Sequence, residues 1–371
     1  MVYRKYGKTG VDVSALGFGC MRLPKAEDGG ADEEKMVSLL RRAYDEGINY
    51  YDTAWGYSNG KSEAVLGRAL ESVRDKVRYA TKLPEWVMKE PGDFWKLLME
   101  SIERLRTGYI DFYHLHALDK ANWKTVLDMG LMKKAEKALS MGLIKYLSFS
   151  FHDEPALMKE IIDTGAFSGV LVQYNLVDDT NAEMMEYAAD KGLGVAVMGP
   201  LGGGSLLAGG DALVKKFDSD AASAAELALR YVWGNRNVSV VLSGMNSDEQ
   251  LTDNLRYAEA SGGIQADEII KIKNKSDELK KLSDLYCTAC GYCEICPEGV
   301  KPAFTFDAYN MLNVWGLKEI ARARYNEFAE YPWHGAHPDK CAGCGECAKR
   351  CPQKIDIPAE LKRASAALSQ L

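Results

Sequence analysis

Eight of the nine cysteines lie in two short runs near the end of the chain, and their spacing is typical of metal ligands. The runs are Cys287-x2-Cys290-x2-Cys293-x2-Cys296 and Cys341-x2-Cys344-x2-Cys347-x3-Cys351, each followed by proline. Thiolates this close together can surround iron or zinc, or pair as disulfides. The chain begins without an apolar signal segment, so we expect a reducing, cytoplasmic setting that favours metal binding.

The second run has the spacing of bacterial ferredoxins, in which each run sends its last cysteine to the other cluster. The sequence therefore predicts two 4Fe–4S clusters with crossed ligands. One would use Cys287, Cys290, Cys293 and Cys351, and the other Cys341, Cys344, Cys347 and Cys296. Similar residues follow both runs, PEGVKP at 297–302 and PQKIDIP at 352–358, which indicates an internal repeat. A pair of zinc sites is the alternative, although zinc ligands usually come as separated Cys-x2-Cys pairs.

Four further side chains of chemically active types follow apolar runs earlier in the chain. Asp52 and Tyr57 lie in DTAWGY, Lys82 ends YATK, and His116 ends DFYHLH. Any one of them has an ordinary explanation, because a tyrosine is usually packed and a lysine usually solvated. Together, an acid, a phenol, an amine and an imidazole at three successive strand ends predict a site that moves protons.

The elements that would position these side chains alternate over the first 260 residues. Short apolar runs, which indicate strands, are separated by amphipathic stretches, which indicate helices. This pattern predicts a (β/α)8 TIM barrel at residues 1–275, followed by a small α-rich dicluster ferredoxin-like domain at 280–371. A doubly wound sheet is the competing interpretation, but no third glycine of GxGxxG follows Gly17 and Gly19. The expected strands are 14–19, 48–52, 77–82, 110–115, 143–149, 169–173, 193–198 and 238–242.

Two smaller elements complete this outline. Residues Tyr3–Tyr6 and Val11–Val13 predict a hairpin that closes the bottom of the barrel. The polar segment 265–285 predicts a helix that leads into the second domain. His114 lies two residues before His116, on the same face of its strand, and we expect it to fill the barrel interior.

Composition and charge exclude several classes of protein. The 371 residues are 47% hydrophobic and 27% charged, which is typical of a globular chain and not of a disordered one. The net charge of −7, from 46 basic and 53 acidic residues, argues against nucleic acid or an anionic membrane as partner. We find no run of 18 apolar residues, so no membrane span is expected.

The first 260 residues resemble the aldo/keto reductase superfamily. The motifs that carry the resemblance are GFGCM (17–21), DTAWGYSNGKSE (52–63), YATKLP with Lys82, DFYHLH with His116, VQYN (172–175), MGPLGGG (198–204) and SGMNSDEQLTDN (243–254). The chain also resembles the branch of that superfamily with a C-terminal 4Fe–4S dicluster ferredoxin-type domain. The resemblance implies an NAD(P)H-dependent oxidoreductase that reduces a small-molecule carbonyl substrate.

The resemblance also implies a role for each residue of the site. Tyr57 would protonate the carbonyl oxygen, and the Lys82 ammonium would lower the pKa of its phenol. Asp52 would hold Lys82 in place, and His116 would orient the carbonyl. The nicotinamide cofactor would contact Gly19, Cys20, Met21, Asp52, Ser150, Gln173, Met198, Gly199, Pro200, Leu201, Gly203, Ser243, Gly244, Met245, Gln250 and Asn254.

Two departures from the family pattern bear on the cofactor. Phe151 stands where relatives have asparagine, so either His152 replaces its amide, or Ser150 and Gln173 alone hold the nicotinamide. Gly244 and Gln250 stand where NADPH-using relatives commonly have basic residues. A dianionic phosphate without a cation binds poorly, which favours NADH, with NADPH as the alternative.

The two halves of the chain leave three functional hypotheses. The first is a carbonyl reductase whose clusters serve electron input, sensing or structure. The second is an electron-transfer or partner-docking protein whose barrel does no hydride chemistry, and the third is a flavin-assisted reductase. Arg322 and Arg324, in an expected helix at 318–330, suggest a surface for an acidic redox partner protein.

Overall fold

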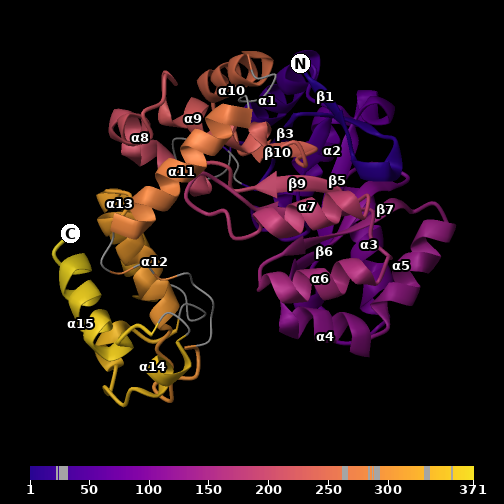
Figure 1. Cartoon of the computed structure of the whole chain (residues 1–371). Helices are drawn as coiled ribbons and strands as arrows, with labels where there is room; N and C mark the ends of the chain where they lie inside the picture. The colour runs from indigo at the N-terminus through magenta and orange to yellow at the C-terminus, as the bar shows by residue number, and fades with distance from the viewer. Residues whose placement is uncertain are drawn as a thin grey trace. The chain divides into compact units, whose positions relative to one another are not determined.

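A computed structural model describes residues 1–21, 24, 32–260, 266–282, 285, 287, 293–329, 335–351 and 354–371. Eight parallel strands close into a barrel in the order β10-β3-β4-β5-β6-β7-β8-β9 (Figure 1). Each expected apolar run overlaps one of these strands, so the (β/α)8 barrel is confirmed. The strands are β3 (Leu16–Gly19), β4 (Tyr50–Asp52), β5 (Arg78–Leu83), β6 (Ile110–Leu118), β7 (Ile144–Phe151), β8 (Gly169–Gln173), β9 (Gly194–Met198) and β10 (Val240–Ser243).

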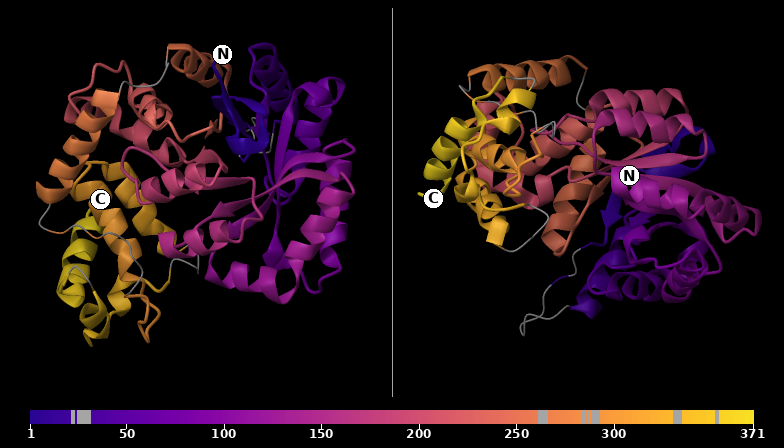
Figure 2. Two further views of the ribbon diagram at one scale, coloured as in Figure 1. Left: turned by 45° about the vertical axis from the view of Figure 1, so that its right-hand side comes forward. Right: turned by 90° about the horizontal axis from the view of Figure 1, so that it is seen from below.

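Helices connect the strands and lie on the outside of the barrel (Figure 2). Their apolar stripes follow the helical period; in the first of them Met36, Leu40 and Ala43 are buried, and Asp32 caps its amino end. The helices of this part are α1 (Glu33–Asp45), α2 (Lys61–Leu70), α3 (Asp93–Arg104), α4 (Lys120–Asp128), α5 (Leu131–Ser140), α6 (Pro155–Asp163), α7 (Ala182–Asp190), α9 (Ala224–Gly234) and α10 (Asp248–Ala260).

The expected N-terminal hairpin is confirmed and fills the amino end of the barrel. Strands β1 (Tyr3–Lys5) and β2 (Asp12–Ser14) pair antiparallel, and Tyr6, which directly follows β1, is fully buried. The Tyr6 ring lies against Gly169 and Gly194, the first residues of β8 and β9. A Cβ would lie only 2.5 Å from this ring on Gly169 and 2.1 Å from it on Gly194. Glycine at both positions therefore lets the tyrosine close this end.

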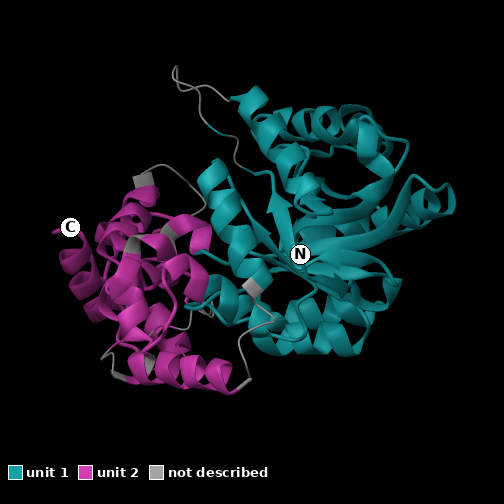
Figure 3. Ribbon diagram, turned by 90° about the horizontal axis from the view of Figure 1, so that it is seen from above, with its two compact units in different colours: residues 1–201, 228–266 teal, residues 202–227, 267–371 magenta. Residues whose placement is uncertain are grey.

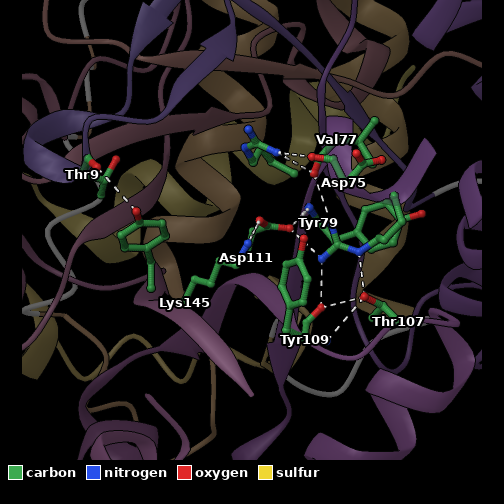
Figure 4. A network of polar contacts seen from close by, with 11 residues as sticks. Thr9, Asp75, Val77, Tyr79, Thr107, Tyr109, Asp111 and Lys145 are labelled. Atoms are coloured by element: carbon green, nitrogen blue, oxygen red, sulfur yellow. Dashed lines mark hydrogen bonds and ion pairs between the residues drawn. The ribbon is translucent and has the colours of Figure 1, made fainter. Parts of the chain in front are cut away.

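A buried carboxylate also ties three strands together at the amino end of the barrel. Asp111 on β6 accepts a hydrogen bond of 3.0 Å from the backbone of Tyr79 on β5, and Arg74 pairs with it at 2.7 Å (Figure 4). Lys145 on β7 lies 3.7 Å from the same carboxylate. The amino ends are thus fixed by structural contacts, while the carboxyl ends carry the chemically active side chains.

The chain divides into two compact units, which Figure 3 colours separately. The barrel unit comprises Met1–Leu201 and Ala228–Ala266, and the second unit comprises Gly202–Leu227 and Asp267–Leu371. The segment Gly202–Leu227 thus belongs to the second unit, although it lies within the expected barrel domain. The expected bounds, 1–275 and 280–371, stay a prediction. Among the residues that the structure describes, no helix is both long and apolar enough to cross a membrane.

The second unit is α-rich, as expected. The helix expected over 265–285 is confirmed as α11, and that over 318–330 corresponds to α13 followed by a 3-10 turn at Glu327–Ala329. Helices α12 and α15 both begin with a proline in their first turn and pack against each other. The elements are the 3-10 helix η4 (Gly202–Gly209), α8 (Gly210–Lys216), α11 (Ala266–Leu282), α12 (Pro302–Asn313), α13 (Lys318–Asn326), α14 (Glu346–Arg350) and α15 (Ile357–Leu368).

Candidate active site and cysteine centre

The carboxyl ends of the barrel strands carry the predicted catalytic residues. Asp52 is the last residue of β4, Lys82 lies near the end of β5, and His116 lies near the end of β6. Tyr57 follows β4 in a turn. In barrels of this kind, side chains at these ends face a common mouth, which is where chemistry takes place.

A buried ion pair forms the floor of the site. The Nζ atom of Lys82 lies 2.6 Å from Oδ1 of Asp52 and donates to the carbonyl of Thr53, also at 2.6 Å. Burial alone would lower the pKa of Lys82, but Asp52 and Tyr57 outweigh that effect and the pKa is raised. Lys82 therefore keeps its proton at neutral pH, and Asp52 is its counter-ion.

The ring of Tyr57 lies against this ion pair. Nζ of Lys82 lies 4.6 Å from the centroid of the Tyr57 ring. Burial raises the pKa of the phenol, and the Lys82 charge opposes that rise without cancelling it. The expectation of a net lowering is therefore wrong in this state, because desolvation of the phenolate outweighs the attraction of one ammonium. Tyr57 consequently carries its proton at neutral pH.

His116 completes the group. Its ring lies 6.0 Å from that of Tyr57 and 4.9 Å from that of Trp86, centroid to centroid. Burial, together with the charge of Lys82, holds its pKa well below the usual range, so the imidazole is neutral. Its Nδ1 atom is buried and has no hydrogen-bond partner among the described residues. A neutral imidazole carries one N–H, which can donate to a carbonyl oxygen.

His114 lies in the barrel interior, as expected. Its side chain is fully buried, and its Nε2 atom is 4.0 Å from Oδ2 of Asp52. Burial, and secondly Lys82, keep its pKa well below the usual range, so it is neutral. It therefore packs beside the carboxylate without adding a second cation to the site.

The residues expected to contact a nicotinamide also occupy strand ends. Two of them already bind each other, since Asn254 donates to Ser243 Oγ at 2.8 Å. A third, Ser150, accepts through Oγ from the backbone N–H of Ala117 at 2.6 Å. A Cβ on Gly199 would lie 2.6 Å from Gln173 Oε1, so only glycine admits that close approach. These contacts order the rim of the barrel.

The remaining expected contacts differ in exposure. Cys20 and Met245 are buried, whereas 57% of Met21 is exposed. Gln250 is exposed, and its Oε1 atom accepts from the backbone of Asn246 at 3.0 Å. The others lie at the ends of β3, β9 and β10, namely Gly19, Met198, Pro200, Leu201 and Gly244, apart from Gly203, which belongs to the second unit.

Sequence reasoning missed Glu85 at this site. It is fully buried at the start of the 3-10 helix η3 (Glu85–Val87), directly after β5. Both of its carboxyl oxygens accept from the backbone N–H of His116, at 2.9 and 3.2 Å. A glutamate within an apolar loop was the only sequence indication. Phe151, in contrast, is buried as its residue type suggests and packs against Phe149.

In the second unit, four of the predicted iron ligands line one cavity. Cys296, Cys341, Cys344 and Cys347 surround a space of about 270 Å³, together with Val300 and other residues. Each of the four is a free thiol. They are the four cysteines that the crossed-ligand hypothesis assigns to one cluster, and three come from one run and the fourth from the other.

The four thiols that line this cavity are available as ligands for the predicted cluster. Among the described residues, no three His, Cys, Asp or Glu side chains gather closely enough to hold one metal ion. For the other predicted cluster, Cys287, Cys293 and Cys351 are described, whereas Cys290 lies outside the described residues. That ligand set stays a prediction.

The two cysteine runs lead into similar structures, which supports the internal repeat. After Cys296 the chain turns and enters α12 at Pro302, and after Cys351 it enters α15 with Pro358 in the first turn. Asn310 on α12 donates a hydrogen bond of 3.1 Å to the carbonyl of Cys287. The helices thus brace the cysteine segments.

Comparisons with known proteins agree with both halves of the chain. A family model described as the aldo/keto reductase family matches residues 15–277, and one described as a 4Fe-4S dicluster domain matches residues 286–355. An uncharacterized oxidoreductase of Bacillus subtilis, YqkF, is 27% identical in an alignment that covers 69% of this chain and 91% of that protein. L-galactose dehydrogenase of Arabidopsis thaliana is 29% identical and covers 68% of this chain and 86% of its own.

Solved structures show the same barrel. The aldo-keto reductase AKR11C1 from Bacillus halodurans, in its holo form, has a TM-score of 0.65 and 27% identity, covering 74% of this chain and 96% of its own. An aldo/keto reductase from Klebsiella pneumoniae, in complex with NADP and acetate, has a TM-score of 0.61 and 21% identity, covering 73% and 94%. Since the family model matches most of the chain and the barrel mouth carries the expected side chains, this protein is an oxidoreductase of the aldo/keto reductase family with a C-terminal 4Fe-4S domain.

Proposed function

We propose that the protein reduces a small carbonyl compound with a nicotinamide cofactor. The observation that carries this proposal is the place of the Tyr57 ring, which lies 4.6 Å from the buried Nζ atom of Lys82 and 6.0 Å from the ring of His116. The phenol of Tyr57 can give a proton to an oxygen that becomes negative, and the Lys82 ammonium can stabilise the phenolate that remains. This arrangement favours the reductase over a barrel without hydride chemistry.

The residues of the chain divide the proton transfer among them. Tyr57 donates its proton to the carbonyl oxygen, and the Lys82 charge stabilises the resulting phenolate. Asp52 keeps that charge in place, and the N–H of His116 orients the carbonyl. A bound nicotinamide supplies the hydride. Because the pKa of Tyr57 is raised, the phenol stays protonated through neutral pH. We expect carbonyl reduction to be lost only as the pH rises towards that pKa.

The chain favours NADH as this cofactor. No basic side chain stands at Gly244 or Gln250, and Asp248 and Glu249 open the helix that follows. The nearby Arg42 is already paired with Asp248 at 2.8 Å. These acidic groups would repel a 2′-phosphate. NADP is bound in the Klebsiella pneumoniae protein, so NADPH is the alternative.

We further propose that the second unit holds two 4Fe–4S clusters. The cavity lined by Cys296, Cys341, Cys344 and Cys347 supports one of them. The other would use Cys287, Cys290, Cys293 and Cys351. Clusters of this kind accept and release single electrons. The chain contributes the thiolates and the helices that hold them.

Substrate and partners follow from the surroundings of the two sites. Trp86, which is 54% exposed beside His116, provides an apolar surface for a small carbonyl substrate. A one-electron redox protein is the partner that the clusters would serve, in the cytoplasm, where thiolates stay reduced. Arg322 and Arg324 contribute less to its docking than expected, because they pair with Glu319 and Asp307.

Replacing Tyr57 with phenylalanine tests the catalytic proposal. Y57F removes the acid and keeps the ring, so we expect the rate of carbonyl reduction to fall by about 10²- to 10⁴-fold. Iron content and NADH affinity should remain at the wild-type level. Turnover is measured as NADH oxidation with a panel of aldehydes and ketones, under anaerobic conditions. Y3F, in the exposed hairpin, is the matched control, and full activity in Y57F would refute the assignment.

Titration of the purified protein with both dinucleotides tests the cofactor preference. We expect NADH to bind with the smaller dissociation constant, measured by quenching of tryptophan fluorescence. We expect this because no basic side chain stands at Gly244 or Gln250, and because the acidic residues at the start of α10 would repel the 2′-phosphate of NADPH. The variant Q250R should strengthen NADPH binding by about tenfold and leave NADH binding almost unchanged. A wild-type protein that binds NADPH much more tightly than NADH contradicts the preference.

Metal analysis of a cysteine variant tests the cluster count. Anaerobically prepared wild-type protein should contain about eight irons and eight sulfides per chain, and C344A about half of that. C20A, which lies in the barrel, is the control and should keep the full content. Zinc in place of iron, or iron unchanged in C344A, would show that the ligand assignment is wrong.

A further inference from the structure

The backbone that presents His116 is irregular. The pairing of β6 with β7 shifts register between Leu115 and Leu118, so the sheet does not bond the residues between them regularly. Within this bulge, Ala117 has a left-handed φ of 51°, a conformation that is unfavourable for a residue with a Cβ. Something outside the strand must therefore hold the bulge in place.

Side chains from neighbouring elements supply these bonds. Glu85 accepts from the N–H of His116 with both oxygens, and Ser150 accepts from the N–H of Ala117. Asn122 donates to the carbonyl of Ala117 at 2.9 Å. The Glu85 carboxyl is itself fully buried, so losing its bond to His116 leaves a backbone N–H without this acceptor.

Glu85 also links the two halves of the catalytic group. It follows Lys82 by three residues, so its position is fixed by the strand that carries the ammonium. The imidazole gains no such anchor from Nδ1, which has no partner among the residues the structure describes. We propose that Glu85 is a positioning residue, which sets the place of the His116 imidazole relative to Tyr57 and Lys82. This inference rests on the proposed role of His116.

Substitutions at Glu85 distinguish the effect of its hydrogen-bond acceptor from the effects of its charge and of its side-chain packing. E85Q keeps one acceptor oxygen and loses the charge, whereas E85M keeps the length and loses both. We expect E85M to lower kcat by about ten- to a hundredfold with little change in NADH affinity, and E85Q to retain most of kcat. Should E85M not fold, E85D, in which the acceptor is drawn away by one methylene, takes its place.

A second measurement does not depend on turnover. The imidazole nitrogen resonances of His116, assigned with H116Q, should move in E85M and stay in place in E85Q. If wild-type protein reduces no carbonyl but E85M still moves these resonances, the proposed function is wrong and the positioning role stands. Wild-type kcat and resonances in E85M, or equal losses in E85Q and E85M, would overturn the positioning role.

An independent observation concerns the loop expected to hold the cofactor. The chain leaves the barrel unit after Leu201, and the segment Gly202–Leu227 packs within the second unit. There Lys216 Nζ donates to the carbonyl of Val314 at 2.6 Å, and the Phe217 ring stacks on Trp315 at 6.1 Å. The end of α8, which follows the expected cofactor loop along the chain, is thus anchored on residues that follow α12.

The same helix contacts a cluster ligand segment. Asn310, four residues before Val314, donates to the carbonyl of Cys287. A continuous path of bonded groups therefore runs from a cysteine segment through α12 to Lys216, and along the chain to Gly199. We infer that cluster loading and dinucleotide binding stabilise each other through Gly202–Leu227. This inference rests on the proposed nicotinamide site.

Two neighbouring lysines provide a matched test. K216M removes the bond to Val314, whereas K215M alters an exposed lysine next to it. K216M should weaken NADH binding by about fivefold or more with unchanged iron content, and K215M should match wild type. Since coupling is reciprocal, NADH should also slow the release of iron to a chelator in wild type and K215M, and less in K216M.

These measurements distinguish a failure of the coupling between cluster loading and dinucleotide binding from a failure of the proposed nicotinamide-dependent function. Wild-type protein that binds no dinucleotide, with or without clusters, contradicts the proposed function. Protein that binds NADH equally well with and without its clusters, and equally in K216M, contradicts the coupling alone.

Discussion

The catalytic half of the molecule depends on one buried ammonium. Lys82 is 1% exposed, and such a charge is stable only where a counter-ion and further acceptors surround it. Asp52 and the carbonyl of Thr53 meet this need because β4 and β5 are neighbouring parallel strands whose carboxyl ends coincide. Removing one partner of a buried pair typically costs about 3–5 kcal/mol. The closed barrel therefore fixes the charge, and the charge fixes where Tyr57 can act.

The sequence predicted the barrel and most of its mouth, because apolar period and strand-end chemistry are local properties. It did not predict that β6 continues to Leu118, since the bulge before that residue is held by Glu85, which follows β5, and by Ser150 on β7. The sign of the Tyr57 pKa shift was likewise out of reach. It depends on how far burial outweighs one nearby charge, and only the folded environment sets that balance.

The cysteine spacing carried more information than any other part of the sequence. Four thiols from two runs line one cavity, as the crossed pattern of ferredoxins requires. The membership of Gly202–Leu227 in the second unit had no sequence indication. That segment looks like an ordinary strand-to-helix connection, and its partners, such as Trp315, lie about a hundred residues later.

The path of the chain also orders events during its synthesis. Leu213, Val214 and Phe217 are buried in the second unit, yet a ribosome completes them well before Trp315 and Leu317 emerge. Strand β10, which closes the barrel against β3, follows that same segment. Until the last third of the chain is made, the nascent barrel carries an apolar insertion without its packing partners.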